Sequence, residues 1–376
     1  MNPSGQVAAE SPPRPVHARA ERDAAPAIGA RPPLALAGSL RSTLCLAEVE
    51  TLMDRLADEA GGEPAGSMVR GHLATGGKRI RARLALAAME ALDEPRDAGV
   101  AWAAACELLH NATLVHDDLQ DGDRVRRGHP TVWALHGAAQ AVNAGDLLLM
   151  LPYLALEHLG TSLDRRWTLA LSLAGHAAAV VRGQAAELAL DPWSDVDWPA
   201  YRAIAEGKTG ALFQLPVEGA AMLAGRSPEE ARHLAGGFRA LGLLFQLQDD
   251  VLDLYGEKGR GAPGSDLREG KTSALVVEHL ALHPDDAPWL RGLLAAPRCE
   301  TPQADVELAV ERFRCGGALE RVLGRINAAA AEALRSPGLA EEPGLHHLAA
   351  ELAGVALHPI EGVRGHGGVR ERETHA

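Results

Sequence analysis

Cysteine is scarce in this sequence, which has only Cys45, Cys106, Cys299 and Cys315 among its 376 residues. No two of these residues form a CxxC pair, and the 16 histidines include no HExxH arrangement. We therefore predict no zinc site. Scattered cysteines in a chain of this length indicate reduced thiols, so we expect a cytoplasmic protein.

Positive charge is also in short supply. The chain has 50 acidic and 37 basic residues, and its formal net charge is -13. Nucleic-acid binding requires a basic surface, so we expect no nucleic-acid partner. An anionic substrate would have to be bound by local metal ions or by clustered Arg and Lys side chains.

Long hydrophobic runs are missing as well. The most apolar stretches, such as Leu147–Leu156, are too short to cross a bilayer, and we expect no membrane span. The N-terminus has no apolar segment after its charged residues, which argues against a secretory signal.

Alternating β-branched residues, which would predict strands, do not occur in convincing runs. Ala and Leu dominate instead, and both favour helices. Apolar residues recur at three- and four-residue spacing in Ile80–Leu92, Val100–Leu119, Ala138–Leu159, Leu169–Leu190, Ala200–Leu223 and Glu229–Leu254. Several of these segments are apolar on nearly all sides, which predicts an all-α, single-domain bundle.

The two ends of the chain differ from this helical part. Residues 1–38 are rich in Pro, Ala and Arg and lack helical periodicity, so we predict a disordered tail. Residues 358–376 contain several Gly and many charges, which predicts a flexible C-terminal tail. The folded domain is then expected to comprise residues 39–357.

Two acidic motifs interrupt apolar helices. In the first, Asp117 and Asp121 are four residues apart and share a helix face. The second motif repeats this arrangement with Asp249, Asp250 and Asp253. Either motif alone could instead be an acidic helix end that is exposed to solvent. The occurrence of two such motifs in strongly apolar helices makes this alternative less favoured. Carboxylates that face one another across a bundle need a cation, and oxygen ligands suit magnesium.

Basic residues that could bind a diphosphate occur in four short segments. Arginine can grip phosphate oxygens with two parallel hydrogen bonds, whereas lysine acts as a point charge. The segments are GGKRIR with Lys78, Arg79 and Arg81, RVRRG with Arg124, Arg126 and Arg127, EGKTG with Lys208 and Thr209, and SDLREGKTS with Lys271.

These motifs together resemble the trans-polyprenyl (isoprenyl) diphosphate synthase family. The matching text is GGKRIRARL, ELLHNATLVHDD, DLQDGDRVRRGHPTVWALHG, NAGD, GQAAE, EGKTGALF, FQLQDDVLD and GSDLREGKTSA, in family order from Gly76 to about Leu275. The resemblance implies the isoprenoid synthase fold, a bundle of roughly 10–15 helices around a central cavity. Two departures are Ala82, where the family often has Pro, and Glu187, where Asp is common.

The resemblance also assigns roles to residues of this chain. It implies magnesium, about three ions per site, held by Asp117, Asp121, Asp249 and Asp253. Catalytic roles fall to Asp117, Asp118, Asp121, Lys208 and Asp249. Isopentenyl diphosphate would be bound by Lys78, Arg81, His110 and Arg127, and the allylic diphosphate by Arg126, Lys208, Thr209, Gln246 and Lys271.

The implied reaction is head-to-tail prenyl transfer, in which isopentenyl diphosphate is joined to dimethylallyl, geranyl or farnesyl diphosphate. A homodimer is implied too. Two alternatives remain: a terpene cyclase on the same fold, and the regulatory subunit of a heteromeric synthase. A cyclase has no use for a second diphosphate site, and such subunits usually lose an acidic motif, whereas this chain keeps both.

Product length is predicted from the helix that carries Asp117. Bulky aromatic residues near this position close the pocket in short-chain members, and Thr113 and Ala112 are small. Leu109 and Cys106 follow, and Trp102 is the first large aromatic, about 22 Å below Asp117. This depth predicts a C20 product. The alternative is that Trp102 is simply a core residue and that another helix forms the floor of the pocket.

Overall fold

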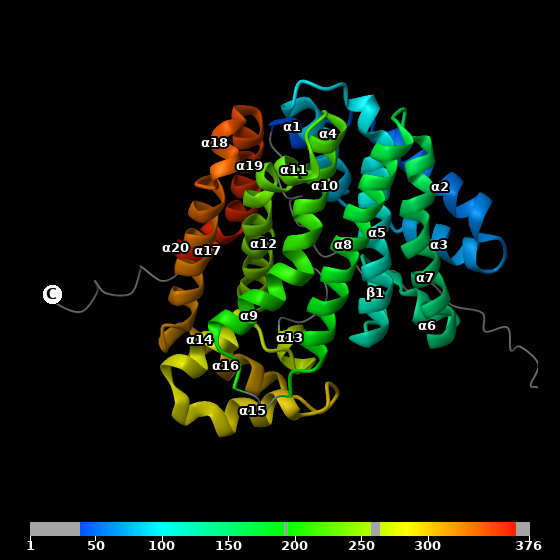
Figure 1. The fold of residues 1–376 in the computed structure, drawn as a ribbon. Helices are drawn as coiled ribbons and strands as arrows, with labels where there is room; N and C mark the ends of the chain where they lie inside the picture. Colours follow the sequence, from blue (N-terminus) through cyan, green and yellow to red (C-terminus); the bar gives the residue numbers. More distant parts are fainter. Residues whose placement is uncertain (1–37, 192, 194, 257–263, 366–376) are drawn as a thin grey trace, which may run out of the picture. The chain divides into compact units, whose positions relative to one another are not determined.

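Helices build nearly all of the structure, a computed structural model that describes residues 38–191, 193, 195–256 and 264–365 (Figure 1). The predicted tail at residues 1–38 lies outside the described residues, except for Gly38. The all-α fold class is confirmed. Many of the helices are rich in Ala and Leu, and several begin or end next to Gly or Pro.

Within the described residues, the elements follow one another as a series of α-helices with five short turns of other helix types. The first half contains α1 (Gly38–Arg41), α2 (Leu46–Gly61), α3 (Ala65–Ala74), α4 (Ile80–Ala91), η1 (Arg96–Gly99), α5 (Val100–Gln120), α6 (Val132–His136), α7 (Ala138–Ala155), η2 (Leu156–His158) and α8 (Leu163–Leu188). The second half contains α9 (Trp198–Ala205), η3 (Glu206–Gly210), α10 (Ala211–Leu223), α11 (Pro228–Leu234), α12 (Gly236–Tyr255), α13 (Ser265–Arg268), α14 (Ala274–Leu282), η4 (Pro284–Asp286), α15 (Ala287–Ala295), α16 (Gln303–Cys315), α17 (Ala318–Leu334), α18 (Pro337–Glu341), α19 (Pro343–Leu357), η5 (His358–Ile360) and α20 (Glu361–Gly365).

Helix α5 lies inside the bundle because it is apolar on all sides. Every residue from 101 to 109 is buried, and Trp102 is fully buried. The helix packs against α4, α7 and α10, while α10 also packs against α8 and α12. The C-terminal ends of α5, α8 and α12 lie at the same end of the bundle, the lower end in Figure 1.

Helix α7 is long and strongly apolar. Together with η2, as Ala138–His158, it is long and apolar enough to cross a membrane by length and composition. It packs along α5, however, and 44% of its apolar window is buried within the fold. A core helix has the same properties, so we interpret α7 as part of the bundle.

Two predicted helices are interrupted in the structure. The segment Ala200–Leu223 forms α9, one turn of π-helix and α10, and the segment Glu229–Leu254 forms α11 and α12. Periodicity misses such interruptions because a π turn adds a single residue to the helical repeat. The π turn η3 contains Lys208 and Thr209, and short π segments often occur at functional sites.

A small hairpin follows the first acidic motif and was not predicted. Strand β1 (Val125–Arg126) pairs antiparallel with β2 (His129–Pro130), with Val125 opposite Pro130. Arg127 and Gly128 form the turn, and both have positive φ, of 54° and 81°. This combination is typical of a tight two-residue hairpin.

The folded part of the chain extends beyond the predicted boundary at residue 357. Residues His358–Ile360 form the turn η5, and Ile360 is fully buried. The boundary predicted at residue 357 is therefore too early in the sequence, because the buried side chain of Ile360 packs this turn against the bundle. Residues 366–376 lie outside the described residues.

Candidate functional site

The first acidic motif ends helix α5. Gly122, with φ of 71°, follows the C-cap residue Asp121 and allows the chain to turn away. The side chains of Asp117 and Asp121 are 17% and 13% exposed, so both face a semi-enclosed space. Burial raises the pKa of Asp117, with Asp121 and Glu187 adding to the rise and Lys208 opposing it. The motif is thus a concentration of negative charge that calls for a cation.

Close packing of glycines brings Lys208 to this motif. A Cβ atom added at Gly183 on α8 would lie 2.7 Å from the backbone nitrogen of Lys208, and one at Gly242 on α12 would lie 2.4 Å from the Cα of Gly210. Only glycine permits backbones to approach so closely. The π turn therefore sits directly between α8 and α12, and its lysine faces α5.

Lys208 bridges two carboxylates. Its Nζ donates to Oε2 of Glu187 at 2.7 Å and lies 3.9 Å from Oδ2 of Asp117. Burial lowers the pKa of Lys208, but Asp117 and Glu187 outweigh this effect and the net shift is upward. The side chain therefore remains an ammonium ion beside the predicted metal ligands.

Lys271 bridges two carboxylates in the same way, those of Asp121 and Glu269. Its Nζ donates to Oδ2 of Asp121 at 2.7 Å and lies 2.8 Å from Oε2 of Glu269. Arg298, from the segment after α15, adds a third cation through Oδ1 of Asp123 at 3.0 Å and Oε1 of Glu269 at 3.1 Å. The first acidic motif thus receives positive charge from two parts of the chain far away in sequence.

The second acidic motif divides into residues with different surroundings. Asp249 is exposed, whereas Asp250 and Asp253 are 4% and 3% exposed. Oδ2 of Asp250 accepts from the hydroxyl of Tyr201 and from the backbone N–H of Ala274, each at 2.7 Å. Its Oδ1 accepts from Nε2 of Gln246 at 3.0 Å. Asp250 therefore ties α9, α12 and α14 together.

Asp253 and Thr209 also make protein contacts. Oδ1 of Asp253 accepts from the hydroxyl of Ser265 at 2.6 Å, and its Oδ2 accepts from the backbone of Asp266 at 3.1 Å. The hydroxyl of Thr209 donates to Oε1 of Gln246 at 2.9 Å. These bonds hold the segment that leads to Lys271 and join the π turn to α12.

A cluster of basic side chains lies about two helical turns before the acidic motif, around His110 of α5. Lys78 and Arg81 flank the start of α4, His110 lies on α5, and Arg127 comes from the hairpin and donates to the carbonyl of Gly76. Within the described residues, Nε of Arg81 and Nδ1 of His110 are buried without a hydrogen-bond partner. Burial, reinforced by Arg81 and Arg127, lowers the pKa of His110 well below its usual value. The unpaired buried N–H of Arg81, with further cations beside it, favours an anionic ligand here.

Arg126 does not join this cluster directly. Its Nε donates to Oδ1 of Asp118 at 2.6 Å, and the Asp118 side chain is 2% exposed. Burial raises the pKa of Asp118 to about 6 in spite of the arginine. The pair connects the hairpin to α5, and the charge of Arg126 acts on both Asp117 of the acidic motif and His110 of the basic cluster.

The residues predicted to limit product length lie along α5 between its N-terminus and Asp117. Trp102, Cys106, Leu109 and Ala112 are buried, and Thr113 is half-buried. The indole Nε1 of Trp102 donates to the carbonyl of Pro216 at 3.0 Å, and a Cβ atom added at Gly219 would overlap the indole ring. Trp102 therefore fixes the crossing of α5 and α10.

The donor set fits a hard divalent cation. No group of three His, Cys, Asp or Glu side chains in the described residues is arranged so that it could hold a metal by itself. The carboxylates of Asp117 and Asp121 nevertheless offer oxygen ligands one helical turn apart, and Oδ2 of Asp118 is buried without a hydrogen-bond partner there. Such a site suits an ion that keeps waters and shares its coordination with substrate phosphates.

Sequence patterns missed several residues of this site. Glu187 was noted only as a departure from the usual Asp, yet it pairs with Lys208. Tyr201 and Arg298 belong to no recognised motif, and nothing in the sequence indicates that they reach Asp250 and Asp123. Glu269 precedes Lys271 by two residues, and this spacing of opposite charges could have drawn attention to it.

Comparisons with known proteins agree with these observations. The family model described as "Polyprenyl synthetase" matches residues 65–312. A short chain isoprenyl diphosphate synthase of Methanothermobacter thermautotrophicus is 39% identical over 214 residues, which are 56% of this chain and 65% of the relative. The match therefore spans slightly less than two thirds of that relative's length.

Two further relatives differ in the product that their names state. A (2E,6E)-farnesyl diphosphate synthase of Mycobacterium tuberculosis is 36% identical over 250 residues, covering 64% of this chain and 68% of that protein. A geranylgeranyl diphosphate synthase of Saccharolobus solfataricus is 34% identical over 248 residues, covering 65% and 74%. Sequence similarity alone thus leaves product length open.

Solved structures share the fold over most of the chain. A polyprenyl synthetase from Streptomyces coelicolor superposes with a TM-score of 0.75 and 26% identity, covering 84% of this chain and 99% of that one. A polyprenyl synthase from Caulobacter crescentus, complexed with calcium and isoprenyl diphosphate, gives a TM-score of 0.72 and 28% identity over 84% and 94%.

Proposed function

This chain belongs to the polyprenyl synthetase family, and from that premise we propose that it joins isopentenyl diphosphate head-to-tail to an allylic diphosphate. The observation that carries the proposal is the presence of two charged clusters along α5. One, the acidic side, pairs the carboxylates at the C-terminal end of α5 with Lys208 and Lys271. The other, the basic side, gathers Lys78, Arg81 and Arg127 around His110, about two turns earlier on the helix. Two diphosphates with different partners fit these two clusters.

The acidic side is assigned to the allylic diphosphate. Asp117, Asp121 and Asp249 would hold magnesium, about three ions per site, and Asp253 would support Asp249 by fixing the following segment. When bound, the ions neutralise the leaving diphosphate. Lys208 and Lys271 add fixed positive charge, while Gln246 and Thr209 orient the π turn.

The basic side is assigned to isopentenyl diphosphate. Nε of Arg81 and Nδ1 of His110 have no partner in the described residues, and a diphosphate would supply one. The guanidinium of Arg81 lies 4.6 Å from the centre of the Phe213 ring, so its orientation is already fixed. Holding both substrates in one geometry lowers the entropic part of the barrier.

The chemical steps follow from these roles. The allylic carbon–oxygen bond breaks and diphosphate leaves with the electron pair, which gives an allylic cation. The double bond of isopentenyl diphosphate attacks that cation, and loss of one proton completes the longer prenyl diphosphate. We assign the proton to the released diphosphate. Water must be excluded because it would react with the cation.

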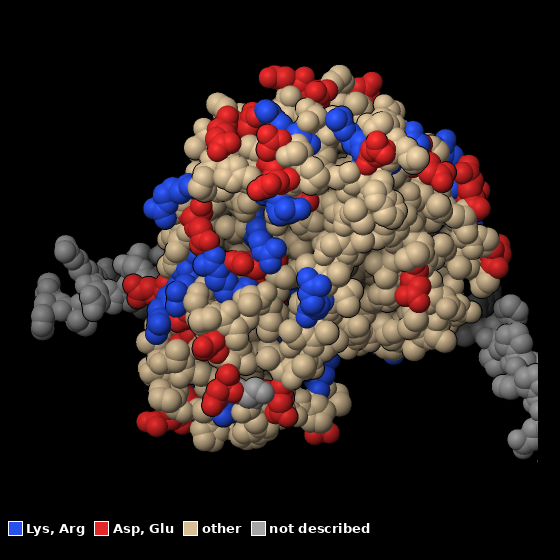
Figure 2. Space-filling view, viewed as in Figure 1, with Lys and Arg blue, Asp and Glu red and all other residues tan. Residues whose placement is uncertain are grey.

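We also propose a homodimer. Apolar side chains are exposed on α7 and α8, and Figure 2 shows that much of the surface over these helices, in the right half of the view, lacks charged groups. The apolar face consists of Val142, Met150, Leu154, Leu163, Trp167, Leu171, Val181 and Leu188, which are 36% to 79% exposed. A face of this kind is typical of a permanent interface.

The product is proposed to be C20, with Trp102 as the floor of the tail pocket. Its full burial and its bond to Pro216 give the indole a fixed position between α5 and α10. The four free cysteines fit a reducing compartment, and we place the protein in the cytoplasm.

A turnover assay tests the proposed reaction. The purified chain is incubated with isopentenyl diphosphate and each of dimethylallyl, geranyl and farnesyl diphosphate, with and without Mg²⁺, and the products are separated by chromatography. We expect metal-dependent chain elongation. Turnover of an allylic diphosphate alone to a cyclic hydrocarbon would support a cyclase, and no turnover without a second protein would support a regulatory subunit.

A further inference from the structure

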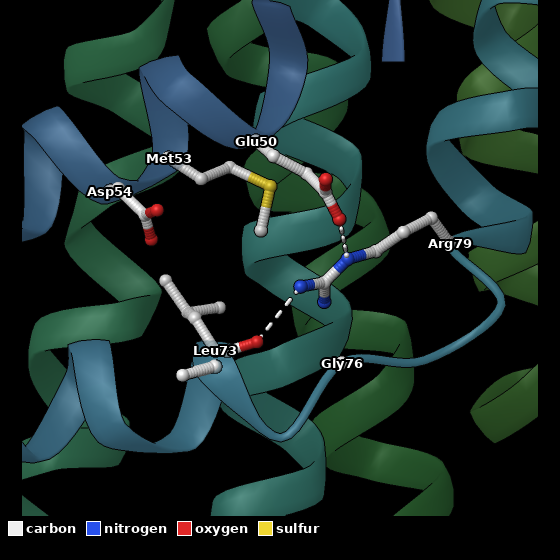
Figure 3. Close-up of a pocket in the computed structure, with 7 residues that line it drawn as sticks. Glu50, Met53, Asp54, Leu73, Gly76 and Arg79 are labelled. Atoms are coloured by element: carbon white, nitrogen blue, oxygen red, sulfur yellow. Dashed lines mark hydrogen bonds and ion pairs between the residues drawn. The ribbon is translucent and has the colours of Figure 1, made fainter. Parts of the chain in front are cut away.

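Arg79 belongs to the segment that carries Lys78 and Arg81, but its side chain points elsewhere. Lys78 is exposed, whereas Arg79 is only 6% exposed. Figure 3 shows its guanidinium directed toward Glu50 and Leu73, which line a crevice together with Met53, Asp54 and Gly76. The side chain of Arg79 therefore points to a different part of the structure from the proposed diphosphate-binding side chains of Lys78 and Arg81.

Three separate elements hold this guanidinium. Its Nε donates to Oε1 of Glu50 on α2 at 3.1 Å, and its Nη2 donates to the carbonyl of Leu73 on α3 at 2.9 Å. Its Nη1 lies 3.8 Å from Oε1 of Glu107 on α5. The loop between α3 and α4 is thus fastened to the helices around it by one side chain.

Glu107 extends this attachment to helix α4. Its side chain is 2% exposed, and its Oε2 accepts from the backbone N–H of Ala82 at 3.2 Å. Ala82 lies in the first turn of α4, where backbone N–H groups have no partner within the helix. Glu107 therefore acts as a cap supplied by another helix, and Arg79 compensates its buried charge.

The backbone of the loop shows that these contacts impose its shape. Arg79 has φ of 50°, a left-handed conformation that non-glycine residues adopt only when the surroundings enforce it. Two further arginines hold carbonyl groups of the same loop: Arg83 donates to Lys78 at 3.0 Å and Arg127 donates to Gly76. Because these contacts fix the backbone of the loop, they also fix the positions of Lys78 and Arg81 on either side of Arg79.

We propose that Arg79 and Glu107 are positioning residues for isopentenyl diphosphate, which hold Lys78 and Arg81 in place without touching the substrate. This inference rests on the proposed function. A displacement of about 1 Å in a substrate-binding group can cost about a hundredfold in rate. Arg81 and Arg83 also interact with Glu107, but loss of Arg79 removes the ion pair that joins this carboxylate to the loop. Both the loop and the first turn of α4 would then shift.

The chain offers a matched control. Arg96 is 8% exposed, its Nε donates to Glu90 at 2.8 Å and its Nη2 donates to the carbonyl of Ser39 at 3.0 Å. It thus makes the same kinds of contact as Arg79, but its partners lie outside the site. Arg79→Gln and Arg96→Gln should lose comparable stability, and only the first should affect the loop.

The experiment compares wild type, Arg79→Gln, Arg79→Lys and Arg96→Gln. It measures the melting temperature, KM for each substrate with the other saturating, and binding of isopentenyl diphosphate by calorimetry. We expect Arg79→Gln to raise KM and Kd for isopentenyl diphosphate about tenfold or more, with KM for the allylic substrate within about twofold. Arg79→Lys keeps the charge but not the three-way contact, so it should show a smaller change in the same direction. Arg96→Gln should leave both KM values near wild type.

The outcomes separate this inference from the proposed function. Equal effects on both substrates, the same effect in Arg96→Gln, or unchanged binding in both Arg79 variants would overturn the positioning role. If Arg79→Gln does not fold, the comparison of Arg79→Lys with wild type decides. Wild-type protein that binds isopentenyl diphosphate without turning it over counts against the proposed reaction, while the calorimetry still tests Arg79.

Discussion

Lys271 and Asp121 are 150 residues apart in sequence, and Nζ of the lysine donates to Oδ2 of the aspartate at 2.7 Å. The contact joins the segment after α13 to the end of α5. It places a cation on the carboxylate that we assign to the metal. In this part of the site, the negative charge of Asp121 is therefore neutralised by a lysine of the same chain. When substrate is bound, the metal ions would pair with the carboxylate and the diphosphate would pair with the lysine.

Both acidic motifs should be needed for turnover. Asp117→Ala and Asp249→Ala are each expected to lower kcat by about 10²–10³, because each removes charge stabilisation of the leaving diphosphate. Circular dichroism should show unchanged helix content. Asp164→Ala, at an exposed carboxylate at the start of α8, serves as the control. Near-normal turnover in either motif variant would remove the basis for a shared metal site.

Acid should destabilise the protein through His72. Burial lowers its pKa to about 4, and Arg126 and Arg127 contribute to this shift. The unfolded chain binds a proton near pH 6.5 that the folded chain binds only near pH 4, so stability is complete above pH 6.5 and declines as pH falls. The free energy of unfolding should be lower by about 3 kcal/mol at pH 4 than above pH 6.5.

Urea unfolding between pH 7.5 and pH 4.5 measures this effect. His72→Gln can still donate to Asn111, the present partner of Nε2 at 3.1 Å, but cannot take up a proton. Its stability should therefore depend less steeply on pH than that of wild type. Parallel curves for the two proteins would show that His72 is not the titrating group.

Product length should respond to the residues of α5 that precede Asp117. Thr113→Phe is expected to shorten the product because it places a bulky ring one helical turn before Asp117. Trp102→Ala is expected to lengthen the product and to cost about 3–5 kcal/mol of stability. Phe313→Ala removes another fully buried aromatic and provides the control for stability. An unchanged product distribution in both variants would mean that the tail does not run along this helix.

The apolar face on α7 and α8 should hold two copies together. Trp167 and Leu171 are one turn apart on α8 and are 64% and 55% exposed. Trp167→Glu with Leu171→Glu should convert a dimer into a monomer, since charged residues are unfavourable in an interface core. Leu44→Glu changes a residue of similar exposure, 63%, outside this face. Light scattering measures the mass, and a monomeric wild-type protein would contradict the proposal.

The sequence by itself determined the helical fold and the composition of the site. Apolar spacing of three and four residues predicts α5 and α12 because burial on one or all sides of a helix requires that spacing. Asp117 and Asp121 must share a face once the helix forms, since four residues make about one turn. The lysines of EGKTG and EGKTS were likewise found from short motifs, which are local in sequence.

Only the tertiary structure decided how these local pieces meet. Nothing in GGKRIR distinguishes Arg79 from Lys78 and Arg81, yet Arg79 is buried against Glu50 and Leu73. The role of Glu187 depends on the approach of Gly183 on α8 to the π turn. Such contacts join residues far apart in the chain, and they depend on helix crossings and backbone distances that packing of the whole core sets.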